Sequence, residues 1–377
     1  MEWHALLHTF GVKEILRAGA RLLATLAIAG CGAVDTADYY WQSASGQLDI
    51  LARAKPIADV IADSDDPALR QRLARVQQMR AFATAELALP DNQSYTRYAD
   101  LGRSFVVWNV FAAPELSLQP RQWCFPVAGC VSYRGYFKEA EAREEAARLM
   151  LAGDDVWVSG VPAYSTLGYF NDPVLSTFVR WPEIDLARMI FHELAHQVVY
   201  VKDDTQFNES FAVAVEEVGI ERWLKAQADP RLDTQFARNQ RLRSVFRELI
   251  RDARARLAAV YASDVADSVK REAKAATFAA MRDGYALAKA EEPGLAGFER
   301  WFAGHGNAGP NNASIASIAL YSGHVPAFRA LLAEEAGDLR RFYARVAEIA
   351  PLPKNERDAL LAKSAPHMVE PAQLGAK

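Results

Sequence analysis

The sequence predicts an α+β fold that is predominantly helical, in which long helices surround a small edge sheet. Patterns rich in Ala, Leu, Arg and Glu recur at helical spacing over residues 36–90 and 234–291. Residues 155–161 instead alternate between apolar and polar side chains, as strands do. The chain of 377 residues is long enough to bury a large core, as one elaborated domain or two closely packed ones.

The amino-terminal half is expected to begin with helices and continue into the sheet. Two helical patterns run from Tyr39 to Ala54 and from Pro67 to Leu89. Residues 101–135 are rich in aromatic side chains and are expected to form strands joined by turns, within a sheet-containing part at 101–180. A charged helix is expected from Tyr136 to Leu151, and β-leaning residues extend through Phe170.

The carboxy-terminal half is expected to be helical. A pair of helices is predicted over residues 183–228, starting after Pro182, which suits a first helical turn. A C-terminal helical part follows at 229–350, and residues after Pro351 are expected to form a loosely ordered tail.

The overall charge and apolar content exclude two classes of protein. The net charge is -4, the pI is about 6.0, and no basic block stands out, so we expect no nucleic-acid partner. No segment after residue 31 reaches the length of a membrane-spanning helix.

The pentapeptide His192-Glu193-Leu194-Ala195-His196 predicts a metal centre. Residues four apart lie on one face of a helix, so both imidazoles can bind one ion. Glu193 then lies near the open coordination position, where it can take a proton from a water that the metal activates. The chain has 7 His, so the pair does not follow from composition; the alternative is a structural His pair beside a solvated Glu.

Catalytic zinc usually takes three protein ligands, and Glu209 is the expected third. It lies thirteen residues after His196, at the start of another helical pattern, so a helix, a turn and a second helix would return its carboxylate to the metal. Glu216 and Glu217 are rivals on the same helix. Glu216 lies about two turns beyond Glu209 on the same face, and we expect its carboxylate to accept a hydrogen bond from an imidazole N–H of a metal-binding histidine.

The motif His-Glu-Leu-Ala-His-Gln, followed by Asn-Glu-x-Phe-Ala, resembles the gluzincin metallopeptidases. The wider context resembles the predicted aminopeptidase lipoproteins of Gram-negative bacteria. The segments that carry this resemblance are Thr166–Leu175, Arg180–Pro182, Phe191–Glu217, Asn311–Ala313 and Tyr321–Leu332. It implies gluzincin-like zinc helices, one Zn2+ ion and a peptide substrate. The Gly-x-Met-Glu-Asn exopeptidase motif of the large zinc aminopeptidases is absent, which leaves exo- and endo-cleavage open.

The resemblance also suggests substrate contacts. In gluzincins the strand before the zinc helix lines the cleft, which implies that Gly168, Tyr169 and Asn171 contact substrate; an ordinary sheet edge is the alternative. An aminopeptidase also needs an acid for the substrate ammonium, and the sequence does not choose among Asp172, Glu183 and Glu216.

Peptide hydrolysis also needs a donor for the oxyanion. Tyr321 is the expected donor because it follows the motif helices and lies in a segment that resembles a family block. The competing residues are His324, His305, Tyr285 and Tyr261.

Residues 1–30 are expected to be an export signal. A basic flank precedes a short apolar core over residues 22–30, too short to span a bilayer. The sequence Ile28-Ala29-Gly30-Cys31 resembles a bacterial lipobox, which implies lipidation of Cys31 and an anchor on the periplasmic face of the outer membrane. The mature metallopeptidase domain would then be residues 31–377. A soluble amphipathic helix with an incidental Cys is the alternative.

The other two cysteines, Cys124 and Cys130, bracket a turn-prone loop in which a disulfide can close. An oxidising periplasm permits such a bond.

From these residues we expect a zinc-dependent peptidase. The family resemblance implies that it is an aminopeptidase. Two alternatives use the same features: a non-catalytic envelope lipoprotein that binds a partner, and a zinc amidase that acts on cell-wall peptides. The intact Glu193 beside both histidines favours catalysis.

Overall fold

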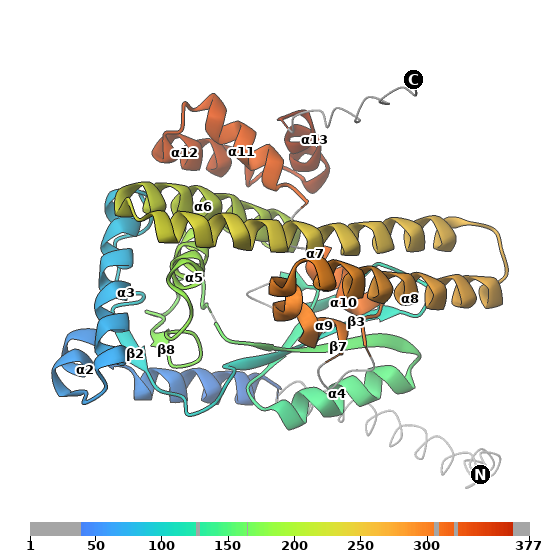
Figure 1. Ribbon diagram of the computed structural model, residues 1–377, viewed down its shortest axis with the longest axis horizontal. Helices are drawn as coiled ribbons and strands as arrows, with labels where there is room; N and C mark the ends of the chain where they lie inside the picture. Colours follow the sequence, from blue (N-terminus) through green and yellow to red (C-terminus); the bar gives the residue numbers. More distant parts are fainter. Residues whose placement is uncertain (1–38, 126–128, 164, 305–308, 320–322, 365–377) are drawn as a thin grey trace, which may run out of the picture. The chain divides into compact units, whose positions relative to one another are not determined.

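The computed structural model describes residues 39–125, 129–163, 165–304, 309–319 and 323–364 (Figure 1). Its contacts divide the chain into a unit that ends at Asp49 and a unit that begins at Ile50. In the first unit the described residues, 39–49, are helical. Every other element belongs to the second unit. Among the described helices, none is both long enough and apolar enough to cross a membrane.

The larger hydrophobic core of the second unit is built mainly from helices, with buried residues of three strands beside them. The helices are α2 (Ile57–Asp63), α3 (Pro67–Ala85), α5 (Glu183–Ala195), α6 (Thr205–Gln227), α11 (Val325–Glu334), α12 (Leu339–Ile349) and α13 (Lys354–Ser364). The tightest approach is between α5 and α6, where a Cβ added to Gly219 would lie 2.8 Å from the ring of Phe191. A glycine is therefore required on α6 for the two helices to pack this closely.

A second core forms beside the first. Helices α7 (Pro230–Ala262) and α8 (Asp267–Glu291) run side by side (Figure 1), and η1 (Pro293–Phe298) and α9 (Glu299–Phe302) pack on them. The rings of Phe246 and Phe298 stack in this core with centroids 4.3 Å apart.

The main sheet has three antiparallel strands. β3 (Val107–Pro114) lies between β6 (Arg134–Tyr136) and β7 (Asp154–Val161). Helices α4 (Glu139–Leu151) and α10 (Asn312–Ala319) both pack against β3 and β7.

Two smaller sheets complete the described part of the unit. In one, β2 (Arg97–Ala99) pairs antiparallel with β1 (Lys55–Pro56) and parallel with β8 (Val174–Leu175). The other is the hairpin of β4 (Trp123–Phe125) and β5 (Gly129–Val131), where a disulfide joins Cys124 to Cys130.

The predominantly helical α+β class is confirmed, but two local predictions are wrong. Residues 165–170 form turns rather than a strand, because Leu167 and Gly168 both have positive φ, at 56° and 84°, which a strand does not accept. The tail expected after Pro351 instead contains α13. Leu361 of this helix is fully buried, so its packing on α11 outweighs a polar sequence.

Candidate metal centre

Helix α5 presents the two histidines. Its apolar residues Leu186, Ile190 and Leu194 are fully buried and fix its rotation against the core. His192 lies in the last turn and His196 follows at the C-cap, so the two rings project from the same side with centroids 4.8 Å apart.

The loop after α5 returns the chain to α6 in a fixed conformation. Asp204 caps α6 by accepting a hydrogen bond from the backbone N–H of Phe207. The side chain of Asn208 spans the loop: its Oδ1 accepts from the N–H of Val201 at 2.8 Å, and its Nδ2 donates to the carbonyl of Val201 at 2.7 Å. The residue that precedes Glu209 therefore holds the loop that connects the two helices.

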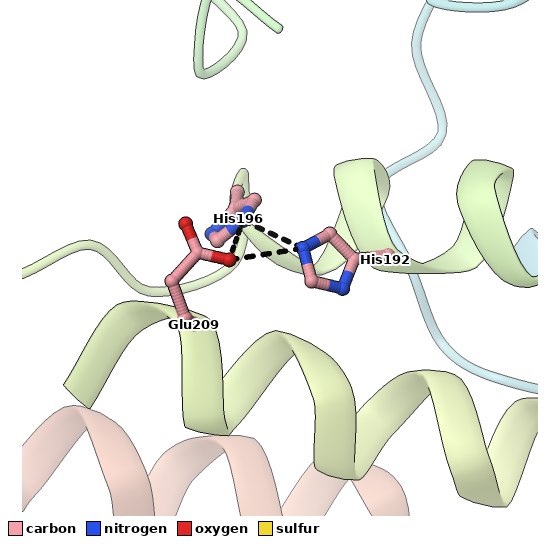
Figure 2. Close-up of side chains that lie close together, drawn as sticks. All are labelled: His192, His196 and Glu209. Atoms are coloured by element: carbon pink, nitrogen blue, oxygen red, sulfur yellow. Dashed lines mark hydrogen bonds and ion pairs between the residues drawn. The ribbon is translucent and has the colours of Figure 1, made fainter. Parts of the chain in front are cut away.

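His192, His196 and Glu209 converge on one point (Figure 2). The two Nε2 atoms lie 3.2 Å apart, and Oε2 of Glu209 lies 3.3 Å from Nε2 of His192 and 3.8 Å from Nε2 of His196. Three ligands at about 2.0–2.1 Å from a tetrahedral ion are separated by about 3.3 Å. The three atoms therefore have the spacing of three corners of a zinc site.

The chemistry of these atoms also fits a cation. Oε2 of Glu209 is buried and has no hydrogen-bond partner among the described residues. A buried carboxylate oxygen without a donor is costly unless a positive charge faces it. The coordination set of two imidazole nitrogens and one carboxylate oxygen is the set that zinc accepts, so the residues present fit the ion.

Glu216 orients the ring of His192. Its Oε2 lies 3.1 Å from Nδ1 of His192, and Arg188 forms an ion pair with its other oxygen. When the ring of His192 is neutral, this contact places its proton on Nδ1, so that the lone pair of Nε2 faces Glu209. Burial acts to raise the pKa of Glu216, but the hydrogen bond from His192 and the charge of Arg188 outweigh it and lower the pKa.

Glu193 lies beside this cluster in a recess of about 500 Å³ that His192, Met189 and Arg243 also line. Burial raises the pKa of Glu193 to about 7, the charge of His192 opposes this shift, and Glu209 adds to it. A carboxylate with a pKa near neutrality suits a group that must both accept and return a proton.

Among the predicted oxyanion donors, the structure describes Tyr261, Tyr285 and His324, whose polar groups have partners away from the three converging side chains. Tyr321 and His305 lie outside the described residues. The hydroxyl of Tyr261 donates to Asn312, and that of Tyr285 donates to the carbonyl of Leu295. The ring of His324 lies 3.7 Å from Asp358 on α13.

Two tyrosines that were not among the predicted site residues interact electrostatically with the acids of the site. The buried hydroxyl of Tyr95 has no hydrogen-bond partner among the described residues, and burial, Glu193 and Asp172 all raise its pKa. Burial and the charge of Glu209 raise the pKa of Tyr200. No sequence signal marks Tyr95, because its position depends on a left-handed backbone with φ of 63°.

The expected substrate segment lies against the end of α5. A Cβ on Gly168 would meet the side chain of Gln197 at 3.5 Å, while Tyr169 is 72% exposed and Asn171 is exposed. Gln197 in turn accepts a hydrogen bond from Asn92 at 2.7 Å, so two loops meet beside His196.

All three acids considered for the substrate ammonium have protein partners. Glu183 accepts from Arg75 and from the indole N–H of Trp223. Asp172 accepts from the backbone N–H of Thr166 at 2.8 Å and from its hydroxyl at 2.9 Å. Glu216 is held by His192 and Arg188, as described above.

Of the two cysteine predictions, the structure describes the disulfide but not the lipidation site. Cys31, like the rest of the proposed signal, lies outside the described residues. In the disulfide hairpin, the backbone N–H of Cys130 donates to Asp203, which belongs to the loop between α5 and α6. The hairpin therefore contacts the segment that leads to Glu209.

Two imidazoles and a carboxylate on adjacent helices, with a second carboxylate beside them, form the kind of site that a metallohydrolase uses. A family model described as "Putative aminopeptidase" matches residues 38–361. The chain belongs to this aminopeptidase family. No match was found among curated proteins or among solved structures.

The buried carboxyl of Asp172 predicts a pH dependence of stability. Burial raises its pKa to about 6, above the value of about 3.9 for an unfolded Asp, so its contribution to stability is full at low pH and is lost as pH rises through 6. Between pH 5 and 8 the wild type should lose about 1.4 kcal/mol relative to Asp172→Asn. Urea unfolding at several pH values measures this, with Asp63→Asn as an exposed control. An unchanged difference would contradict the prediction.

Proposed function

We propose that this protein is a zinc-dependent aminopeptidase of the gluzincin type. One observation carries the proposal: His192, His196 and Glu209 meet at the spacing of a zinc site, beside Glu193, in a chain of an aminopeptidase family. The residues that would hold the ion are His192 and His196 through Nε2 and Glu209 through Oε2.

A bound zinc would polarise the scissile carbonyl and lower the pKa of a water molecule, so that this water loses a proton readily and attacks the carbonyl carbon. Glu193 then accepts the proton that the attacking water loses, and returns it to the leaving amine nitrogen as the C–N bond breaks. Glu216 keeps the ring of His192 in the tautomer that leaves Nε2 free. Tyr321 remains our proposed donor to the oxyanion.

We propose that the mature chain begins at a lipidated Cys31 and faces the periplasm from the outer membrane of a Gram-negative cell. The lipobox-like sequence before Cys31 supports this location. The disulfide between Cys124 and Cys130 also supports it, because such bonds persist in oxidising compartments.

Substitution of Glu193 separates chemistry from metal binding. Glu193→Gln removes the proton acceptor but none of the proposed ligands, so kcat should fall by about 100- to 10,000-fold while zinc content is retained. His196→Ala should lose both. Turnover of an aminoacyl-coumarin substrate and zinc content by mass spectrometry provide the two measurements. Near-normal turnover in Glu193→Gln would contradict the mechanism.

Glu216 should affect zinc affinity without being a ligand. Glu216→Gln replaces the acceptor for Nδ1–H of His192 with a weaker one, so zinc affinity should fall by about 10- to 100-fold. Glu217→Gln is the matched control, because among the described residues the ion pairs of His192 and His196 are with Glu209 and Glu216 and not with Glu217. Competition with a chromogenic chelator measures both. Equal affinities in the two variants would argue against an orienting role.

Recognition of a free amino terminus distinguishes an aminopeptidase from an endopeptidase. We expect peptides with free amino termini to lose single residues in order from that end. Their acetylated counterparts should be cleaved at least about tenfold more slowly, because an aminopeptidase pairs an acid with the substrate ammonium. Mass spectrometry of the products distinguishes stepwise release from internal cleavage. Internal cleavage of acetylated peptides would refute the aminopeptidase assignment but not the metal centre.

A further inference from the structure

Helix α7 carries a row of four arginines along one face. The row consists of Arg243, Arg247, Arg251 and Arg254. Their sequence spacing places them within about 80° around the helix axis and over about 17 Å along it. Arg243 lines the recess that also contains His192 and Glu193. The row, which we call the arginine stripe, therefore begins at the proposed active site.

The other three arginines of the stripe line a second cavity of about 470 Å³. The disulfide hairpin contributes Cys130 and Ser132 to its wall, and the start of α6 contributes residues 203–206. Gln206 lies one turn before Glu209 on α6. The second cavity and the proposed metal site are thus adjacent along α6 as well as along α7.

The stripe gives this cavity a surplus of positive charge. On the facing wall, Asp204 is paired with Arg357 at 2.7 Å and contacts Lys354, and Asp203 accepts the N–H of Cys130. Among the described residues, Arg247 and Arg254 form no ion pair within 4.0 Å. Within the described part of the chain, the ion pair of Arg251 is with the exposed Asp252, at 3.7 Å, and such a pair adds little.

We propose that the arginine stripe binds carboxylates of an extended peptide, so that the enzyme prefers acidic peptides. This inference rests on the proposed function and names its substrate class. An extended chain rises about 3.3 Å per residue, so the stripe spans about five residues of peptide. Arg243 already pairs with Asp185 at 2.7 Å, which leaves Arg247, Arg251 and Arg254, further along the stripe, to meet the carboxylates of the peptide. Guanidinium groups bind carboxylates through two parallel hydrogen bonds, which makes arginine suited to this role.

The test measures binding in Glu193→Gln protein, so that peptides are not consumed. The probes are three fluorescein-labelled heptapeptides with free amino termini: one with Glu at positions four to six and an amidated end, one with Gln there and an amidated end, and the Gln peptide with a free carboxyl end. Fluorescence anisotropy at low and high salt gives each affinity. The test substitution is Arg251→Gln with Arg254→Gln. Arg256→Gln is the control, since Arg256 is exposed on the opposite face of α7.

We expect the Glu peptide to bind at least about tenfold more tightly than the amidated Gln peptide, with the preference shrinking at high salt. The preference should disappear in the double variant and persist in Arg256→Gln. If only the Gln peptide with a free carboxyl end bound more tightly, the stripe would bind a terminal carboxylate, and the proposal would be supported in that form. Equal binding of all three peptides, or a preference that survives the double variant, would overturn it. Turnover of the neutral peptide by wild-type protein tests the proposed function separately.

Discussion

The packing of α5 against α6 is the constraint on which the site depends. Gly219 lets the two helices approach until a Cβ would collide with the ring of Phe191. This contact fixes the register of α6, in which Glu209 and Glu216 lie two turns apart on one face. In that register Glu209 meets Nε2 of His192 while Glu216 meets Nδ1 of the same ring. A slip of one turn, about 5.4 Å, would break both contacts together.

Charge balance explains why this arrangement suits a divalent ion. Glu193, Glu209 and Glu216 are gathered around two imidazoles, and Arg188 pairs with one of the three carboxylates. Negative charge in a poorly solvated site is costly until a cation faces it. The raised pKa of Glu193 expresses this cost, because the site favours one proton there. A divalent ion would balance the remaining charge while using the unpartnered oxygen of Glu209.

The sequence predicted the helices and which side chains share a helix face because local spacing determines them; the approach of Glu209 to the two histidines depends on the packing of α5 against α6. His192 and His196 must share a helix face, and Glu209 and Glu216 must share another. It failed where tertiary contacts decide conformation. Residues 165–170 turn because Asp172 and the hydroxyl of Thr166 bond to backbone N–H groups there. Helix α13 is held by the packing of Leu361 on α11 and by Arg357, which pairs with the buried carboxylate of Asp204; no local pattern marks either contact.

The loop between α5 and α6 shows how distant segments serve the site. Three contacts hold it: Asn208 bonds to Val201, Arg357 of α13 pairs with Asp204, and Cys130 of the disulfide hairpin donates to Asp203. Asp203 has a φ of 66°, a left-handed conformation that a non-glycine residue keeps only when its surroundings impose it. The loop is therefore held by groups from α6, α13 and the disulfide hairpin. These contacts place the start of α6, and with it Glu209, beside the two histidines.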